Sequence, residues 1–363
     1  MSHHFQLRSS VLPLRFFPGG LGARLSCNEP KHLGNSSSVG VAVASPSRTL
    51  QRHQANAKAT AKEVGVQETA QGSAALGWAA RDASGVLSPF DFSRRAQKDD
   101  DVTIKVLYCG ICHTDLYTIK NEWGTAMYPV VPGHEILGVV TSVGSGVTKF
   151  KAGETVGVGY FLGSCRSCEC CGNGYENYCS GMVLTSNGID REHGGEVTQG
   201  GFSDVLVVNK DYVIRVPDGL PLAGAAPLLC AGVTVYSPMV EYGLNAPGKH
   251  LGVVGLGGLG HVAVKFGKAF GMTVTVISSS DRKRDEALGR LGADAFLVSS
   301  DPEQMKAAAG TMDGIIDTVS AGHAIVPLLD LLKPMGQMVV VGAPSKPLEL
   351  PAFAIIGGGK RLA

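Results

Sequence analysis

The strongest constraint on the fold is an alternation of apolar strands and helical stretches from about residue 250 onward. Short apolar segments occupy 251–255, 273–278, 295–298, 314–319 and 338–342. Between them we expect helices over 259–270, 282–291 and 324–332, and another around Gln304. Strands that are separated by crossover helices pair in parallel. The alternation therefore predicts a doubly wound parallel sheet.

A glycine motif of the form G-x-G-x-x-G occupies 255–260, where the first of these strands meets the first helix. The first glycine permits a tight turn, the second lets the backbone approach a pyrophosphate, and the third lets helix and strand pack closely. The N-terminus of the helix adds free N–H groups and a positive dipole. The motif predicts a dinucleotide site.

The end of the second strand indicates which dinucleotide is bound. An NAD site places Asp or Glu there, about 20 residues beyond the glycines, to bind the ribose 2′-OH. This chain instead has serines at 278–280, followed by Arg282 and Lys283. Hydroxyls and cations suit a 2′-phosphate, which favours NADP. The alternative is an ordinary solvated helix start with Asp281 as its N-cap.

Four cysteines are spaced C-x₂-C-x₂-C-x₇-C, and they are Cys165, Cys168, Cys171 and Cys179. A structural zinc ion takes four ligands in a tetrahedron, and short spacers let one loop supply all of them. Cys170 is the alternative to Cys171, which keeps the x₂ spacing. Disulfide frameworks belong to small secreted domains rather than to a chain of 363 residues. The cluster predicts a closed zinc site.

Three more candidate ligands lie outside this cluster. Cys112 follows a strand, His134 precedes one, and Cys230 lies at the entrance to the alternating region. Each alone is compatible with an ordinary core residue, but together they fit a Cys₂His site with a fourth position open for chemistry. Cys27 and Cys109 have no partner in this scheme, and we expect them to be inert thiols.

The region before Cys230 reads mostly as β-structure. Strand-like runs occupy 102–107, 136–143, 155–158 and 202–208, and glycine-rich turns such as 144–146 separate them. This pattern favours a small irregular barrel whose loops carry ligands.

Length and charge limit the possible classes of protein. A chain of 363 residues, 44% hydrophobic and 17% charged, is expected to form two globular domains. Its 32 basic and 31 acidic side chains give a net charge of +1, so nothing favours nucleic acid or an anionic membrane as a partner. No apolar run of about 18 residues predicts a transmembrane helix.

The segment 1–75 differs in composition from the rest. Its first 62 residues contain one acidic residue, Glu29, and five arginines, Arg8, Arg15, Arg24, Arg48 and Arg52. This composition resembles an organellar transit peptide but lacks an amphipathic period. We expect a disordered extension, or an upstream stretch wrongly joined to the coding sequence, and a cytoplasmic protein. Import into plastids is the alternative.

Together these motifs resemble the zinc-dependent medium-chain alcohol dehydrogenases, in particular the plant cinnamyl alcohol dehydrogenase and mannitol dehydrogenase group. The resemblance begins near Leu76, and it rests on GICHTD at 110–115, GHE at 133–135, the four cysteines, LLCAGVTVYSP at 228–238, GLGGLG at 255–260 and ISSSDRK at 277–283. It implies a GroES-like catalytic domain over 76–231 and an NADP-binding Rossmann domain over 232–363.

The resemblance also implies roles for single residues. Cys112, His134 and Cys230 would hold a catalytic zinc, with Glu135 beside them or as a transient ligand, so that the chain binds two zinc ions. Asp115 would orient a ligand, or else cap its loop. The expected NADP contacts are Thr114, Thr234, Gly255, Leu256, Gly257, Gly258, Leu259, Gly260, Ser278, Ser279, Ser280, Lys283, Thr318 and Gly342.

The implied reaction is reversible reduction of a cinnamyl-type aldehyde, as in lignin-related metabolism. Zinc would polarise the carbonyl, NADPH would supply hydride, and the Thr114 hydroxyl would relay the proton. Tyr117 stands where many relatives have a histidine, so we expect proton transfer to be slower or to use water. Leu184 stands where lignin-type members have a tryptophan, which leaves a mannitol or other polyol dehydrogenase as the alternative.

The C-terminus departs from this pattern. A doubly wound sheet of this type has about six strands, and the chain ends at 359–363, where the sixth is expected to begin. We therefore expect an incomplete sheet whose fifth strand is an open edge. The homodimer of the resembled family uses the segment beyond, and a truncated, inactive zinc-binding protein is the remaining alternative.

Overall fold

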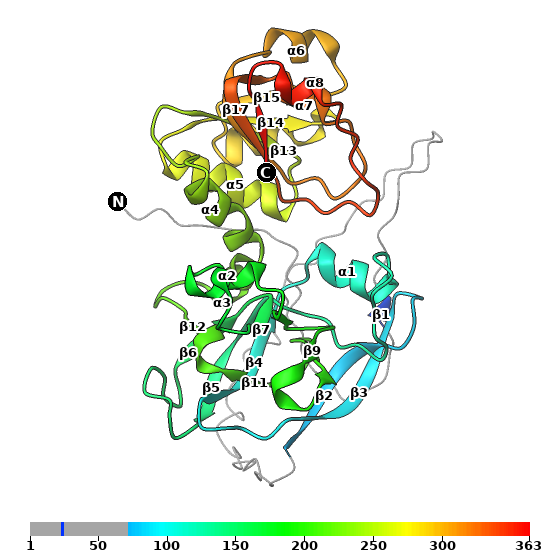
Figure 1. Ribbon diagram of the computed structural model, residues 1–363, viewed down its shortest axis with the longest axis vertical. Helices are drawn as coiled ribbons and strands as arrows, with labels where there is room; N and C mark the ends of the chain where they lie inside the picture. Colours follow the sequence, from blue (N-terminus) through cyan, green and yellow to red (C-terminus); the bar gives the residue numbers. More distant parts are fainter. Residues whose placement is uncertain (1–22, 25–71) are drawn as a thin grey trace, which may run out of the picture.

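The computed structural model describes residues 23–24 and 72–363. The expected extension over 1–75 thus lies almost wholly outside the described residues, as does Cys27. Strand β2 begins at Ser73, within the last residues of that segment. Two groups of elements follow, which we call the β-rich half (72–230) and the parallel-sheet half (231–363), and Figure 1 shows the second above the first.

The β-rich half consists of small antiparallel sheets. A five-stranded sheet has the order β11-β4-β5-β6-β12, and its strands are β4 (Asp101–Cys109), β5 (Ile136–Val143), β6 (Thr155–Val158), β11 (Val205–Asn209) and β12 (Ile214–Arg215). A second sheet, β1-β3-β2, contains β1 (Ala23–Arg24), β2 (Ser73–Ala80) and β3 (Val86–Arg94). Two short pairs are β7 (Phe161–Gly163) with β8 (Val183–Leu184) and β9 (Ile189–Asp190) with β10 (Glu196–Val197). The helices are α1 (His113–Lys120), α2 (Glu169–Gly172) and α3 (Leu222–Ala225).

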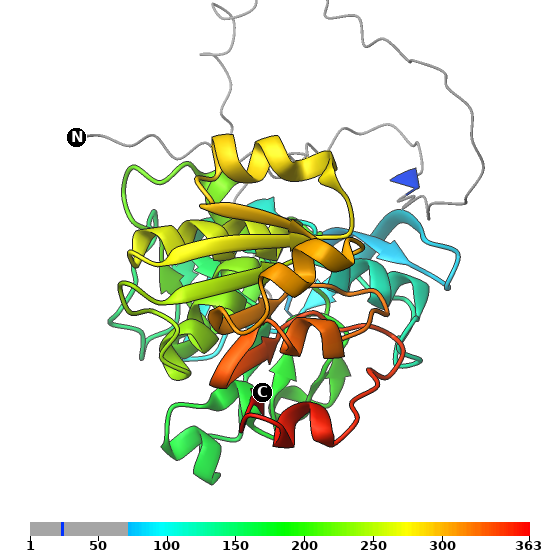
Figure 2. The same ribbon diagram turned by 90° about the horizontal axis from the view of Figure 1, so that it is seen from above.

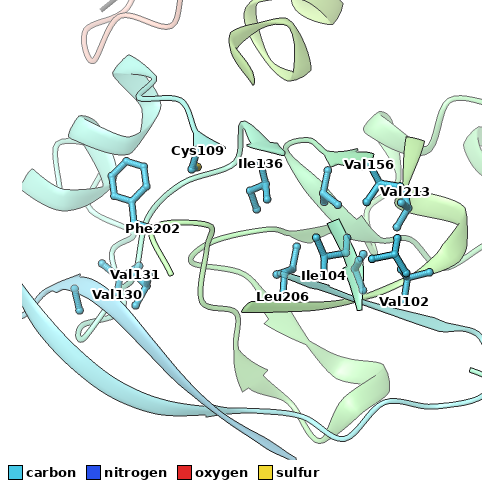
Figure 3. Packing of buried hydrophobic residues seen from close by; sticks show 14 of the residues in the cluster. Val102, Ile104, Cys109, Val130, Val131, Ile136, Val156, Phe202, Leu206 and Val213 are labelled. Carbon is cyan, nitrogen blue, oxygen red and sulfur yellow. The ribbon is translucent and has the colours of Figure 1, made fainter. Parts of the chain in front are cut away.

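The core of this half lies between its sheets. Ile104, Ile136 and Leu206 are fully buried there, and Figure 3 shows them with Phe202 and neighbouring valines. Each points inward because the side chains of a strand alternate between its two faces. Cys109 packs in the same core at 2% exposure, and burial raises the pKa of its thiol well above the usual value, as expected of an inert thiol.

The parallel-sheet half confirms the predicted fold class. Its strands are β13 (His250–Val254), β14 (Thr273–Ser278), β15 (Ala295–Val298), β16 (Met312–Asp317), β17 (Leu332–Val340) and β18 (Arg361–Leu362), and they pair in parallel in the order β15-β14-β13-β16-β17-β18. Figure 2 looks down on this half and shows the strands side by side. The order reverses between β13 and β16, and a ligand of such a sheet binds at that point.

The helices of this half are α4 (Ala231–Glu241), α5 (Gly258–Ala269), α6 (Pro302–Ala307), α7 (Val326–Leu329) and α8 (Phe353–Ile356). The expected helix over 282–291 is present as a continuous helical segment over 281–290, which begins as a 3₁₀ turn (Asp281–Lys283) and ends as a π turn (Glu286–Arg290). Gly289 lies inside the π turn, where glycine weakens an α-helix, and the Leu291 amide bonds to the Glu286 carbonyl, five residues back.

The fifth strand, β17, was expected to form an open edge. This expectation was wrong, because part of β17 is paired with a further strand. Strand β18 pairs with β17 through Gln337 with Arg361 and Met338 with Leu362. The Ala363 amide donates to the Met338 carbonyl at 2.9 Å, and the Ala363 carbonyl accepts from Val340 at 2.8 Å. These backbone bonds begin the sixth strand of the doubly wound order.

No described helix is by itself long and apolar enough to cross a membrane. By length and composition alone, one bent pair of described helical segments would be sufficient. These segments are Leu222–Leu229 and Ala231–Glu241, and the bend between them is 52°.

Candidate active site

Helix α1 brings several candidate residues to one place because it begins directly after β4. Its N-cap is Cys112, whose backbone N–H donates to Asp115 Oδ2 at 2.9 Å. Asp115 Oδ1 accepts from the Gly133 amide at 2.8 Å, so this carboxylate joins the loop of Cys112 to the loop before β5. The carboxylate is 2% exposed and holds both loops in a fixed relation.

The same carboxylate orients His134. The Nδ1 atom of the imidazole lies 3.0 Å from Asp115 Oδ1, and a carboxylate there keeps the proton on Nδ1. Nε2 is buried and has no hydrogen-bond partner in the described chain. Buried polar atoms are rarely left unpaired, so a free Nε2 is the expected state of a nitrogen that binds a metal.

The other candidate ligands converge on this nitrogen. Ligand atoms of Cys112, His134, Glu135 and Cys230 all lie within 4.8 Å of one another. The two sulfur atoms are 3.8 Å apart, and two thiolates on a tetrahedral zinc with bonds of about 2.3 Å are separated by about 3.8 Å. The residues present therefore fit a zinc ion.

The surroundings of this site shift the pKa values of two of its residues strongly. The Cys230 thiol, as hydrogen-bond donor, and the nearby His134 lower the pKa of Cys112 to about 4, which favours the thiolate that binds metal. Burial raises the pKa of Glu135 to about 8. Gly110 makes room for this carboxylate, since a Cβ at Gly110 would lie 1.9 Å from Glu135 Oε2.

The four-cysteine cluster lies in a separate lobe, which we define as 164–181. Ligand atoms of Cys165, Cys168, Cys171 and Cys179 are all within 4.8 Å of one another. The Cys171 sulfur is 3.5 Å from that of Cys168 and 4.0 Å from that of Cys165. Cys170 is not in this group, so the geometry favours Cys171 as the third ligand. The set fits a closed Cys₄ zinc site.

A cleft of about 1290 Å³ lies between the two halves. Cys112, Thr114 and Cys230 line it from the β-rich half, and Thr234 and Leu259 line it from the parallel-sheet half. Two of the candidate metal ligands, Cys112 and Cys230, and Leu259 of the glycine loop therefore face a common space. Its size is that of a cofactor or substrate site.

The glycine loop has the geometry that its motif requires. Gly255 has φ +82°, and a Cβ at Gly260 would lie 2.1 Å from the Gly255 carbonyl oxygen, which only glycine allows. A Cβ at Gly257 or Gly258 would instead meet nothing within 4 Å. Because packing does not demand glycine at these two positions, the loop leaves room for a pyrophosphate at the N-terminus of α5.

The polar residues expected at the nucleotide site surround this loop. Ser278 ends β14, and Ser279 is exposed just beyond it. Lys283 Nζ donates to the Leu256 carbonyl, which brings a cation to the glycine loop. Asp281 forms an ion pair with Arg284 at 2.5 Å, and it is not the N-cap of the turn, since that position belongs to Ser280.

Two further expected residues lie where the strand order reverses. The Thr318 hydroxyl donates to the Val254 carbonyl at 2.7 Å, which joins the ends of β16 and β13. The Gly342 amide donates to the Asp317 carbonyl at 3.0 Å, and a Cβ there would lie 2.2 Å from the Val319 oxygen. Both residues thus connect the ends of strands at the point where the strand order reverses.

The structure gives Leu184 a smaller role at the cleft than expected and adds Tyr160, which the sequence analysis did not identify. Leu184 lies on β8 and is not among the residues that line the cleft, whereas Met182 is. Tyr160 lines the cleft, and its ring stands edge-on to the His134 imidazole with centroids 5.2 Å apart. No motif identifies Tyr160; its position directly after β6 was the available signal.

Two family models match this chain. Residues 98–218 match the family model "Alcohol dehydrogenase GroES-like domain", and 258–363 match "Zinc-binding dehydrogenase". The chain is 74% identical over 317 residues to "Probable cinnamyl alcohol dehydrogenase 8C" of Oryza sativa subsp. japonica, covering 87% of this chain and 71% of the relative. It is 62% identical over 289 residues to "Probable mannitol dehydrogenase" of Mesembryanthemum crystallinum, covering 80% of each.

Solved structures show the same relationship. A cinnamyl alcohol dehydrogenase from Sorghum bicolor is 79% identical, with a TM-score of 0.79 over 80% of this chain and 82% of that one. The corresponding enzyme of Helicobacter pylori, solved with NADP(H), is 38% identical, with a TM-score of 0.75 over 80% and 82%. The chain therefore belongs to the zinc-dependent alcohol dehydrogenase family, within its plant cinnamyl alcohol dehydrogenase and mannitol dehydrogenase group.

Proposed function

We propose that the protein reduces cinnamyl-type aromatic aldehydes to alcohols with NADPH, reversibly, at a zinc ion held by Cys112, His134 and Cys230. The observation that carries the proposal is the unpartnered Nε2 of His134, buried beside the thiols of Cys112 and Cys230, both of which line the cleft together with Leu259 of the glycine loop. Glu135 is the fourth member of the ligand group and serves as a transient ligand.

The lining of the cleft supports an aromatic substrate. Tyr117, Trp123, Tyr160 and Phe161 all contribute to it. Flat aromatic faces and edges favour a conjugated ring over a flexible polyol, whose hydroxyls would need polar partners. Relatives named as cinnamyl alcohol dehydrogenases include two that are 74% and 79% identical to this chain, whereas two named as mannitol dehydrogenases are 62% and 63% identical.

The chemistry divides between the bound groups and the chain. Zinc supplies a Lewis acid for the carbonyl oxygen, and NADPH supplies the hydride. Asp115 fixes the imidazole of His134 so that Nε2 faces the site. Thr114 lines the cleft two residues after Cys112, and its hydroxyl passes a proton between the substrate oxygen and solvent. The aromatic side chains exclude water from the reacting atoms.

The remaining expected roles belong to the same proposal. NADP binds along Gly255 to Gly260 with Thr234, Thr318 and Gly342 around it, and Ser278, Ser279, Ser280 and Lys283 surround its 2′-phosphate. A second zinc is held by Cys165, Cys168, Cys171 and Cys179. We place the protein in the cytoplasm.

The function can be tested with the purified full-length chain. We expect oxidation of NADPH with coniferaldehyde or cinnamaldehyde, slower reduction of NADP⁺ with mannitol, and about two zinc ions per chain. Faster turnover of mannitol would favour the polyol dehydrogenase. Absence of turnover with every aldehyde, at full zinc content, would contradict the proposal.

Preference for NADPH should depend on Arg282. This side chain is exposed beside the serines that follow β14, where it can pair with a 2′-phosphate. Arg282→Ala should raise the KM for NADPH about tenfold, the value of one charge-assisted hydrogen bond, and leave the KM for NADH unchanged. Arg290→Ala is the matched control, because it removes an exposed arginine from the far end of the same segment. Equal effects of the two variants would contradict the assignment.

A further inference from the structure

Tyr117 crosses the cleft between the two halves. Its side chain is 7% exposed, and its ring packs edge-on against His113 and Trp123, with centroid distances of 4.5 and 5.0 Å. Its hydroxyl donates to the backbone carbonyl of Ser320 at 2.8 Å, over a separation of 203 residues. A tyrosine fixed in the β-rich half thus bonds to the parallel-sheet half.

The accepting carbonyl belongs to a loop that is closed upon itself. Residues 318–325 connect β16 to α7. The His323 Nε2 atom lies 2.8 Å from Asp317 Oδ2, and its Nδ1 atom lies 2.9 Å from the Ala321 carbonyl. The Asp317 side chain is fully buried and also accepts from the Val319 amide. The loop therefore presents Ser320 from a rigid base at the switch point.

A second tyrosine spans the halves elsewhere along the cleft. Tyr175, in the four-cysteine lobe, donates its hydroxyl to Glu241 Oε1 at 2.9 Å, and Glu241 is the last residue of α4. Both tyrosines line the cleft. The Tyr175 bond is exposed and contributes little, whereas the Tyr117 bond is part-buried and contributes more.

We propose that Tyr117 is a positioning residue that ties α1 to the loop over 318–325 and so sets the distance between the metal ligands and the nucleotide site. The proposal rests on the proposed function for its effect on the cofactor. Tyr117 is not the proton carrier that its place in the sequence suggests, because its hydroxyl proton is donated to a fixed carbonyl. Proton transfer therefore depends on Thr114 and water.

Tyr117→Phe tests the tie, because it keeps the ring contacts and removes only the hydroxyl. We expect amide hydrogen exchange of 318–325 to accelerate about 2- to 12-fold, the value of one net hydrogen bond, and the Kd for NADPH to rise by a similar factor. Exchange and cofactor binding are measured on the full-length, zinc-loaded chain and need no turnover. Unchanged exchange in 318–325 would overturn the proposal.

Tyr128→Phe is the matched control. The Tyr128 hydroxyl also donates to a backbone carbonyl, that of Ile119 at 2.7 Å, but both residues lie in the β-rich half. This variant should leave the exchange of 318–325 at the wild-type rate, and an equal acceleration would mean that a general loss of stability is responsible.

A third variant separates the tie from a proton relay. Tyr117→His supplies the imidazole found in many relatives, and it should weaken NADPH binding as Tyr117→Phe does. Wild-type NADPH affinity together with faster turnover at neutral pH would instead identify a relay position and overturn the proposal. If the wild-type chain reduces no aldehyde while Tyr117→Phe still accelerates exchange and weakens NADPH binding, the tie stands and the proposed activity fails.

Discussion

His134→Ala should lower kcat/KM for cinnamaldehyde by well over 100-fold and reduce bound zinc from two ions per chain to one. Residues that only orient a ligand cost about 10- to 100-fold when removed, and His134 is proposed to be a ligand itself. The Nε2 atom that the variant removes is buried and otherwise unpartnered. Zinc is counted by inductively coupled plasma mass spectrometry on dialysed protein, alongside initial rates of NADPH oxidation.

His193→Ala is the control for this experiment. His193 also holds its Nδ1 atom 2.8 Å from an aspartate, Asp190, but it belongs to neither group of candidate metal ligands. This variant should keep two zinc ions and nearly full activity. Retention of two zinc ions by His134→Ala would exclude His134 as a ligand and contradict the proposed active site.

Arg94→Met should destabilise the protein by about 3–5 kcal/mol, a loss on the order of 10 °C in Tm. Arg94 is 8% exposed, and its guanidinium donates to the carbonyls of Val205 and Gly200 at 2.9 Å, to that of Gln199, and to Ser203 Oγ at 2.7 Å. Methionine fills the volume but removes all four of these donated bonds, and Ser203 Oγ remains as a donor to the Gly200 and Val205 carbonyls. The Tm is measured by differential scanning calorimetry at fixed zinc concentration.

Arg81→Met removes a closely similar but exposed arginine. Arg81 donates to Ser88 Oγ and to the Pro89 carbonyl at 3.2 Å, and it stacks over Phe90 at 5.3 Å, as Arg94 stacks over Phe92 at 4.8 Å. Water can replace its bonds, so we expect a change below about 1 kcal/mol. Equal losses for the two variants would show that burial of the Arg94 acceptors does not determine the effect.

The Arg94 variant should also affect activity before the protein unfolds. The Gly201 amide donates to the Gly133 carbonyl at 2.8 Å, directly before His134. The arginine thus supports the loop on which the proposed ligand rests, and its removal should lower zinc affinity at temperatures well below Tm.

Much of the fold could be predicted because strand periodicity and glycine placement are local signals. The predicted strands over 136–143, 155–158, 273–278 and 295–298 coincide with β5, β6, β14 and β15. The expected helix over 282–291 lies within one residue of the helical segment at 281–290, but its 3₁₀ and π turns could not be predicted from the pattern. The pairing of β18 was missed because only two residues form it, too few for a period to show.

The site could be predicted only where chemistry restricts residue type. Cysteine spacing and the GHE motif at 133–135 indicated which residues gather, and the structure brings them together. The hydrogen bond from Tyr117 to Ser320 could not be predicted, because serine contributes its backbone carbonyl, which every residue has. The position of Tyr160 over His134 depends likewise on how β6 and β5 pair, and not on a motif.

Helix α1 has only eight residues, yet the helix and its N-cap together provide four residues with proposed roles. Within six positions the chain places a candidate metal ligand at Cys112, a hydroxyl at Thr114, an orienting carboxylate at Asp115 and the tie to the other half at Tyr117. Each added residue turns a helix by about 100°, so an insertion between Asp115 and Tyr117 would swing the ring away from Ser320 while the ligand stayed in place. In natural variation this segment should therefore resist changes of length as well as substitutions at these four positions, because both the residue types and their spacing are needed.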